Sequence, residues 1–288
     1  MPTPERQLSF SAHSLQAYVD CARRYELSYL EELKWPAVDS EPLLQSERHM
    51  VDGRRFHEMV HRDVLGISVP VPDSAKDADI SRWWNSFMVQ RPADVDGERF
   101  AEKTLIGTIG VSTGVSTGGS TIVATCDLIV IGNGETQGSR RARIFDWKTW
   151  RRRHTREWLA DRLQTRIYPY LLVQAGAALA DGKPLTPDEI EMVYWYSNFS
   201  NEPEVFAYNE EQYRQDEAYL GGLVDEILSR EAGTFELTTD EKKCMFCVYR
   251  SFCDRGGVAG YLDDGDLESE EEAPSQLGDL DDYEAIAF

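Results

Sequence analysis

The chain has 288 residues, of which 41% are hydrophobic and 28% charged, a balance typical of a folded globular protein. Its net charge of −21 would argue against a nucleic-acid enzyme if the acidic residues were evenly spread. No basic segment leads into an apolar run at the N-terminus, and Pro169, Gln174 and Gly176 interrupt the long apolar stretch. The sequence therefore predicts a cytoplasmic protein without a signal peptide or a membrane span.

The charge is unevenly distributed along the chain. Eleven acidic residues and no basic one follow residue 262, so we expect one domain over residues 1–261 and an acidic disordered tail over residues 262–288. Residues 140–166 instead hold ten Lys or Arg against three acids, a local charge of +7. Such a stretch suits a nucleic-acid backbone, although a solvated surface is an equally common origin of a basic cluster.

Helical patterns dominate the first third of the chain. Ser11 or Ser14 can cap a helix that runs to about residue 33, and a second helix is predicted over residues 53–65. A third surrounds the Trp83-Trp84 pair, which we interpret as core packing.

Strand patterns follow, separated by a turn region rich in Gly, Ser and Thr. Strands are predicted over residues 103–110, 121–131, 141–149 and 191–196. Helices are predicted over residues 157–180 and 210–230. This order favours an α/β or α+β domain with a central mixed sheet flanked by helices.

Two aspartates and a lysine form a candidate catalytic set. Asp146 and Lys148 are two apart in a predicted strand, so their side chains leave the same face of the sheet. If Ile131 pairs with Ala142 across the preceding turn, Asp127 stands opposite Asp146. Opposed like charges are destabilising, and a divalent cation such as Mg²⁺ between them would remove the repulsion and activate a water. Lys148 would then orient that water or neutralise charge on a phosphate.

Four ordered motifs resemble the RecB-like nucleases of the PD-(D/E)XK superfamily over residues 11–253. They are Gly53-x-x-x-His57, Asp127 in Thr-Cys-Asp-Leu-Ile, Asp146-Trp-Lys148, and Gln164-x-x-x-Tyr168. The resemblance implies a restriction-endonuclease-like core. It further implies that Mg²⁺ or Mn²⁺ is held by His57, Asp127 and Asp146, and that the site is flanked by Gln164 and Tyr168, which help to hold DNA.

A rival pattern lies in the same segment. His57-Glu58-Met-Val-His61 also matches H-E-x-x-H, in which two histidines bind zinc and Glu58 is the base of a metallopeptidase. Such enzymes need a further protein ligand downstream, and no Glu occurs between His61 and Glu98. The zinc peptidase is therefore the remote alternative, and on the nuclease interpretation His61 is structural.

Five cysteines without a secretion signal favour metal ligation over disulfides. Cys244-x2-Cys247-x5-Cys253 is a compact ligand set that needs a fourth ligand from elsewhere, and Cys21 is the candidate. This arrangement resembles the iron-sulfur staple of AddB-type and CRISPR-adaptation nucleases, which implies a 4Fe-4S cluster joining both ends of the domain. Zinc bound by the same four thiolates remains the alternative from spacing alone.

Two details qualify the cysteine assignment. The resembling proteins usually carry proline after the first cysteine, where this chain has Ala22. Cys126, next to Asp127, alternates to the opposite face of its strand and is expected to be a buried core residue.

The resemblance as a whole implies a Mg²⁺- or Mn²⁺-dependent deoxyribonuclease acting on single-stranded DNA or DNA ends. Exonuclease action is favoured over endonuclease action, in DNA repair, recombination, phage defence or CRISPR adaptation. A non-catalytic iron-sulfur DNA-binding subunit is the alternative, against which the Asp-Asp-Lys set argues. An acidic disordered tail often serves only solubility, which is one interpretation here. The tail also mixes apolar residues with acids and ends on Phe288, so the alternative is that it docks a protein partner or folds back onto residues 140–166.

Overall fold

The computed structural model describes residues 9–34, 41–91, 96–110, 119–134, 139–245 and 247–256, with the side chains of residues 41–47 excepted. The predicted acidic tail, and with it the domain boundary after residue 261, lies outside these residues. No helix in the described ranges combines the length and the apolar character that spanning a bilayer requires.

One mixed sheet forms the centre of the fold, in the order β1-β3-β4-β5-β6 with β2 paired to β3. Its strands are β1 (Ser9–Ser11), β2 (Glu98–Ile109), β3 (Ser120–Asn133), β4 (Arg140–Lys148), β5 (Ile190–Tyr196) and β6 (Glu204–Ala207). β1 runs parallel to β3 and β4 parallel to β5, whereas the other pairs are antiparallel. The predicted mixed sheet is thus confirmed, and β1 and β6 are strands that the sequence patterns did not show.

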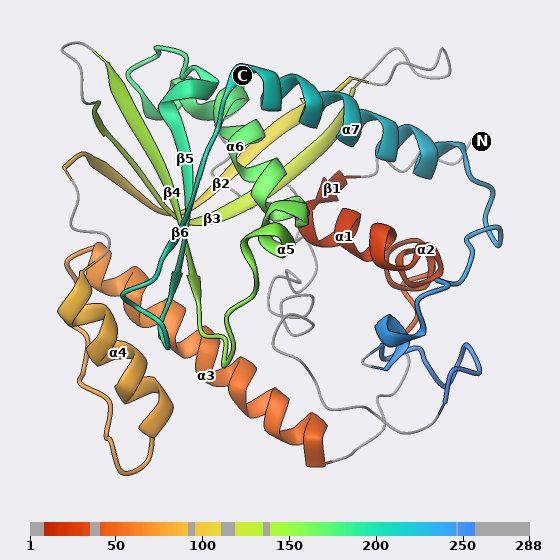
Figure 1. Ribbon diagram of the computed structural model, residues 1–288, viewed down its shortest axis with the longest axis horizontal. Coiled ribbons are helices and arrows are strands. Elements are labelled where there is room, and N and C mark those ends of the chain that lie inside the picture. Colours follow the sequence, from red (N-terminus) through yellow and green to blue (C-terminus); the bar gives the residue numbers. More distant parts are fainter. Residues whose placement is uncertain are drawn as a thin grey trace, which may run out of the picture.

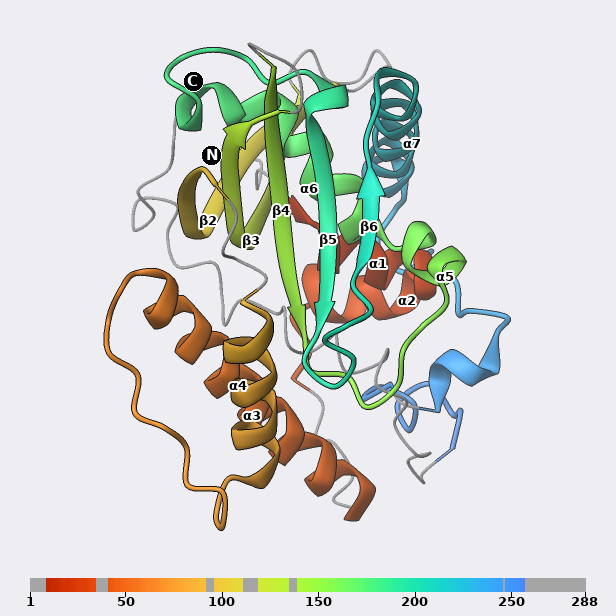
Figure 2. The same ribbon diagram turned by 60° about the vertical axis from the view of Figure 1, so that its left-hand side comes forward.

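Helices cover both faces of this sheet. The α-helices are α1 (Ala12–Asp20), α2 (Ala22–Tyr25), α3 (Glu41–Val64), α4 (Ala78–Gln90), α5 (Arg156–Asp161), α6 (Leu163–Ala175) and α7 (Glu210–Ser229). A π-helical turn η1 (Glu26–Leu30) and three 3-10 turns complete them, namely η2 (Gly176–Leu179), η3 (Pro187–Glu189) and η4 (Glu241–Cys244). α3 and α4 lie on one side of the sheet, and α1, α6 and α7 lie on the other (Figure 1; Figure 2).

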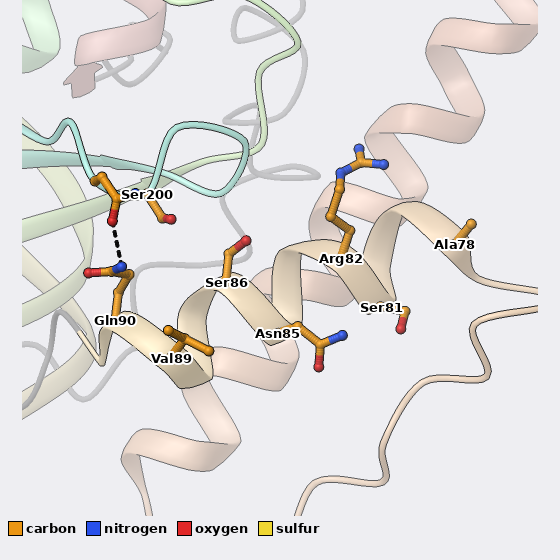
Figure 3. A pocket seen from close by; sticks show the side chains of 9 residues that line it. Ala78, Ser81, Arg82, Asn85, Ser86, Val89, Gln90 and Ser200 are labelled. Atoms are coloured by element: carbon orange, nitrogen blue, oxygen red, sulfur yellow. Dashed lines mark hydrogen bonds between the residues drawn. The ribbon is translucent and has the colours of Figure 1, made fainter.

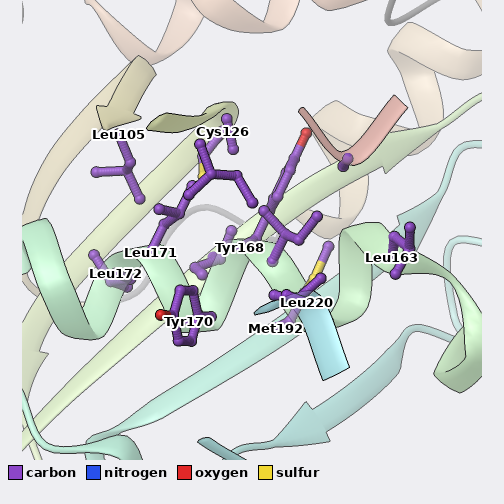
Figure 4. Packing of buried hydrophobic residues seen from close by; sticks show 14 of the residues in the cluster. Leu105, Cys126, Leu163, Tyr168, Tyr170, Leu171, Leu172, Met192 and Leu220 are labelled. Carbon is purple, nitrogen blue, oxygen red and sulfur yellow. The ribbon is translucent and has the colours of Figure 1, made fainter. Parts of the chain in front are cut away.

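Each face of the sheet has its own hydrophobic core. The larger core joins α1, α6 and α7 to the sheet and contains Cys126, which is fully buried as predicted (Figure 4). The smaller core joins α3 and α4 to the strands and is rich in aromatic rings. Trp83 and Trp84 are 0% and 5% exposed within it, which confirms that this pair is core packing.

Two predicted helices are broken, so their prediction as single helices is wrong. The helix from Ser11 begins as expected, with reciprocal side-chain to backbone bonds between Ser11 and Ser14, but it stops at Cys21, whose backbone is extended. There Arg23 N–H donates to the carbonyl of Glu236. A tertiary partner has replaced the regular helical bond.

The second broken helix is the one predicted over residues 157–180. It is interrupted at Arg162, whose backbone is extended (φ −70°, ψ 138°), and α6 begins anew at the next residue. The side chain of Gln16 from α1 accepts a hydrogen bond from Leu163 N–H at 3.1 Å, so α1 caps the new helix. This restart sets the direction of α6, and with it the position of Gln164.

Candidate active site and cysteine site

The β3–β4 hairpin has the register that the sequence predicted. Ile131 pairs with Ala142, and the ladder continues to the pair Leu128 and Phe145. At the next position, which holds Asp127 on β3, the two strands are joined differently. Trp147 N–H donates to Asp127 Oδ2 at 2.8 Å. The ladder therefore ends where the two predicted aspartates face each other.

Three side chains close a polar triangle beside this point. Lys148 Nζ lies 2.9 Å from Asp146 Oδ2 and donates to Gln164 Oε1 at 3.1 Å. Gln164 Nε2 in turn donates to Asp146 Oδ1 at 2.6 Å. All three residues are 4–5% exposed, so the ion pair is held in a region of low water content. The structure thus brings together one residue pair from β4 and one residue from α6, as the motifs predicted.

Aromatic rings surround the lysine of this triangle. Lys148 Nζ is 5.1 Å from the ring centre of Trp150 and 5.5 Å from that of Tyr194. A desolvated ammonium group gains electrostatic stabilisation from such ring faces. The rings also restrict the ammonium group to the side of the carboxylate.

His57 reaches the site from α3. Its Nδ1 lies 3.2 Å from Asp127 Oδ1. Burial alone would raise the pKa of Asp127, but His57, the Trp147 N–H and the Lys148 ammonium together hold it below its ordinary value. Asp127 is therefore a carboxylate in this site.

Glu102 is a member of the site that the motifs did not show. It lies on β2 opposite Asp127, and its φ of 48° is unusual for a residue in a strand. Burial, reinforced by Asp127 and Asp146 and opposed by His57, raises the pKa of Glu102 to about 7. His61 Nδ1 lies 3.9 Å from Glu102 Oε1. The predicted strand began one residue later, and only the β2–β3 register could have indicated this acid.

The sheet changes faces at these residues. Cys126 belongs to the larger core and Leu128 to the smaller one, although side chains two apart in a regular strand share a face. The β2–β3 ladder also has no pair between Ala101–Leu128 and Lys103–Cys126. This irregularity turns the carboxylates of Asp127 and Glu102 out of both cores.

The donor chemistry suits a divalent cation. His57 and Glu102 flank the Asp127 carboxylate, and Asp146 lies on the neighbouring strand β4. Burial, and after it the charges of Asp127 and Asp146, raises the pKa of Glu102. Oxygen-rich sets of this kind bind Mg²⁺ or Mn²⁺. Within the described residues no three His, Cys, Asp or Glu side chains are grouped closely enough to hold a metal ion. Asp146 contacts Lys148 and Gln164 instead.

Tyr168 lies one helical turn after Gln164 on α6. It is 5% exposed and packs in the larger core (Figure 4). Its role in holding DNA stays a prediction, whereas its packing position on α6 is clear.

The basic stretch is largely neutralised in the fold. Acids on η3, β5, the β5–β6 turn, β6 and α7 face it, in the pairs Arg140–Glu189, Arg141–Glu191, Arg143–Glu191, Arg153–Glu202, Arg156–Glu204 and Arg166–Asp216. A charge of +7 along the sequence therefore does not become an equally positive surface. Arg151 and Arg152 are exposed at the end of β4.

A shallow polar cleft of about 580 Å³ lies between α4 and the β5–β6 turn, lined by Asn85, Gln90 and Asn201 among others (Figure 3). Near it, α4 is joined to the segment after β4 by Asn198. Its Oδ1 accepts from Trp83 Nε1 at 3.0 Å, and its Nδ2 donates to the carbonyls of Thr149 and Trp150 at 3.0 and 2.7 Å.

The four predicted cysteines, Cys21, Cys244, Cys247 and Cys253, line one small cavity. Arg24, Arg250 and Arg255 also line it. Burial raises the pKa of the Cys244, Cys247 and Cys253 thiols, and Arg24 opposes the rise at Cys247. Guanidinium groups favour thiolates, which are the metal-binding form. The predicted convergence of both ends of the domain is therefore present, although the described thiols are not grouped tightly enough to form a metal site as they stand.

Comparison with known proteins agrees with this geometry. A family model described as the PD-(D/E)XK nuclease superfamily matches residues 9–254, and the chain belongs to that superfamily. Its nucleases use divalent metals such as Mg²⁺ or Mn²⁺ to hydrolyse phosphodiester bonds. This family leaves the zinc peptidase alternative without support.

Among solved structures, the crystal structure of SSO0001 is similar over 87% of each chain, with 13% identity and a TM-score of 0.37. Among curated proteins no match is found.

Proposed function

We propose that this protein is a divalent-metal-dependent DNA nuclease of the RecB-like branch. The observation that supports this most is the Asp146, Lys148 and Gln164 triangle beside Asp127, at the end of the β3–β4 ladder. Packing alone does not explain why a lysine and a glutamine are both buried against the same carboxylate. They suit a site that must handle negative charge on a phosphodiester.

Each side chain has a distinct task in this proposal. A Mg²⁺ or Mn²⁺ ion bound here would supply an activated water and neutralise charge on the phosphodiester. Asp127, Asp146 and His57 would hold the cation, with Glu102 beside them. Gln164 orients the Asp146 carboxylate, and Lys148 donates a hydrogen bond to a phosphate oxygen or to the attacking water.

The substrate we propose is single-stranded DNA or DNA ends, degraded by exonuclease action. The ordered His57, Asp127, Asp146-x-Lys148 and Gln164-x-x-x-Tyr168 motifs support the RecB-like branch, to which strand-degrading enzymes of repair, recombination, phage defence and CRISPR adaptation belong. The exposed Arg151 and Arg152, directly after the catalytic strand, support contact with a backbone.

We further propose that the four cysteines hold a 4Fe-4S cluster, with zinc as the alternative. Their shared cavity and its three arginines support a metal centre of negative charge. Such a centre would fasten α1 and α2 to the segment after η4. Anaerobically purified protein should then be brown, with broad absorption near ~400 nm. Colourless protein containing one zinc per chain would favour zinc instead.

The nuclease proposal is tested by cleavage of labelled single- and double-stranded DNA with Mg²⁺, Mn²⁺ or EDTA. Asp127→Asn and Lys148→Met should each lose at least ~10²- to 10³-fold in rate, since removing one charge-stabilising contact already costs that much. Glu58→Gln is the matched control, because Glu58 is exposed on α3 next to His57. It should retain cleavage.

The outcome also separates the alternatives. Metal-independent cleavage, or variants as active as the wild type, would contradict the site assignment. DNA binding without cleavage in the wild type would instead indicate the non-catalytic subunit.

A further inference from the structure

A stack of flat groups stands on the chain directly after the catalytic strand. The rings of His154 and Trp158 lie 4.0 Å apart at 20°, in stacking geometry. The guanidinium carbon of Arg162 lies 4.8 Å from the centre of the Trp158 ring. Trp150 meets His154 edge-on at 4.8 Å. This stack is thus formed by the loop that follows β4, by helix α5, and by Arg162 at the start of α6.

This stack is connected to the catalytic lysine through a single ring. Lys148 Nζ is 5.1 Å from the centre of the Trp150 ring, which in turn contacts His154. The path from Lys148 over the Trp150 ring to His154 is therefore no longer than about three nucleotides of a stacked strand, at ~3.4 Å for each nucleotide. A nucleotide close to the scissile phosphate would therefore reach the stack.

Exposure and charge suit the same ligand. His154 and Trp158 are half-buried, whereas Arg151 and Arg152 in the preceding turn are exposed. Proteins that bind single strands combine cationic groups along the backbone with aromatic rings on which bases stack. A duplex offers such rings little, because its base faces are already covered by neighbouring bases.

We propose that the His154–Trp158 stack is the base-stacking platform for an unpaired strand whose phosphodiester lies at Lys148. This inference rests on the proposed nuclease function and adds how the substrate strand is held. A base extends the stack on the side of His154, and Arg151 and Arg152 contact the adjoining phosphates. Stacking does not distinguish deoxyribose from ribose, so the platform accepts any unpaired strand.

The test measures binding of the full-length protein to a fluorescein-labelled single-stranded oligodeoxynucleotide by anisotropy in EDTA. His154→Ala should weaken binding ~5-fold or more, because one base–aromatic stack contributes ~1–3 kcal/mol. His154→Phe keeps a flat ring without the imidazole nitrogens and should stay within ~2-fold of the wild type. Trp158 packs against the larger core, so Trp158→Ala is informative only if its thermal midpoint is unchanged.

An abasic strand of equal length is the second probe. The wild type should bind the abasic strand as weakly as His154→Ala binds the base-containing strand. The affinity for the abasic strand should be the same in the wild type and in His154→Ala. Asn85→Ala, in the cleft on α4, is the matched control.

The results separate this inference from the proposed function. Equal binding of the base-containing strand by the wild type and His154→Ala overturns the platform while leaving the nuclease intact. A loss caused by Asn85→Ala but not by His154→Ala overturns it as well, and places the strand along α4. A wild type that neither binds nor cleaves DNA overturns the proposed function itself.

Discussion

The two candidate sites of this protein are built in different ways. At the proposed catalytic site, Asp146 and Lys148 lie in the β4–β5 ladder, and Gln164 lies in the first turn of a helix. Asp127 lies on β3, where its ladders with β2 and β4 are interrupted. At the cysteine site, Cys21 lies at the break between two helices, and its three partners lie at the end of a 3-10 turn or in the turns that follow. Hydrogen-bonded strands and a helix position most residues of the first site. The cysteines of the second site lie at breaks and turns, where such regular structure is absent.

This difference predicts how each site would depend on the metal proposed for it. The strand register places the carboxylates whether or not a cation is present, and their mutual repulsion is the cost. The thiols have no ladder to position them, so a metal that bridges them contributes directly to the folding of the segments it joins. Metal loss should therefore affect activity at the first site and stability at the second.

The largest expected effect is on stability at the cysteine site. Cys21→Ser should release the bound iron or zinc and lower the free energy of unfolding by at least ~3 kcal/mol, because a structural metal supplies ~10 kcal/mol or more. That corresponds to ~6–12 °C in thermal midpoint, at ~2–4 °C per kcal/mol for a domain of this size. Metal content and calorimetric melting measure the two quantities.

Cys126→Ala is the matched control for this substitution. Cys126 is buried in the larger core and away from the cysteine cavity, so its variant should keep the full metal content. Its stability should fall only by the small cost of a lost core sulfur. If Cys21→Ser retains metal and melts with the wild type, the proposed difference between the two sites is wrong.

A smaller effect should come from the link between α4 and the catalytic strand. Asn198 donates to the carbonyls of Thr149 and Trp150, immediately after Lys148. Asn198→Ala should lower kcat ~10-fold, since small displacements of catalytic groups are costly, and lower stability by ~1–3 kcal/mol. Single-turnover cleavage measures the first quantity and melting the second.

Asn209→Ala provides the control for Asn198→Ala. Asn209 caps α7 by accepting a hydrogen bond from Gln212 N–H, so its loss costs ~0.5–2 kcal/mol of stability without touching β4. It should cleave DNA at the wild-type rate. Equal loss of kcat in both variants would mean that general destabilisation, and not positioning of β4, explains the effect.

The same contrast explains what the sequence could predict. The β3–β4 register followed from turn length and two flanking strands, so the opposition of Asp127 and Asp146 was predictable. The approach of Cys21 to the C-terminal cysteines was predicted from ligand number and resemblance. The helix breaks at Cys21 and Arg162 were not predictable, because the competing hydrogen bonds come from Glu236 and Gln16, which are both remote in sequence. Local periodicity contains no information about such partners.

Glu102 gives the smallest expected effect, and its pH dependence tests the environment of the proposed catalytic site. Its folded pKa of about 7 lies above its ordinary value of 4.5, because of burial and then the charge of Asp127. The stability that this shift contributes is fully present below pH 4.5 and is lost as the pH rises through about 7. The Glu102→Gln variant imitates the protonated form of Glu102 at every pH, so it does not lose this stability as the pH rises.

In EDTA, the wild type and Glu102→Gln should therefore melt together near pH 4.5, and the variant should melt higher at pH 8. Because the Glu102 side chain is 39% exposed, solvent screening limits the difference to ~1 kcal/mol or less, or ~2–4 °C. Glu58→Gln removes the same formal charge from the surface of α3 and controls for net charge. Adding Mg²⁺ should reverse the order at pH 8, since a cation that neutralises the carboxylates favours the chain with more of them. A difference between wild type and Glu102→Gln that stays constant with pH would show that the pKa of Glu102 is not raised in the free protein.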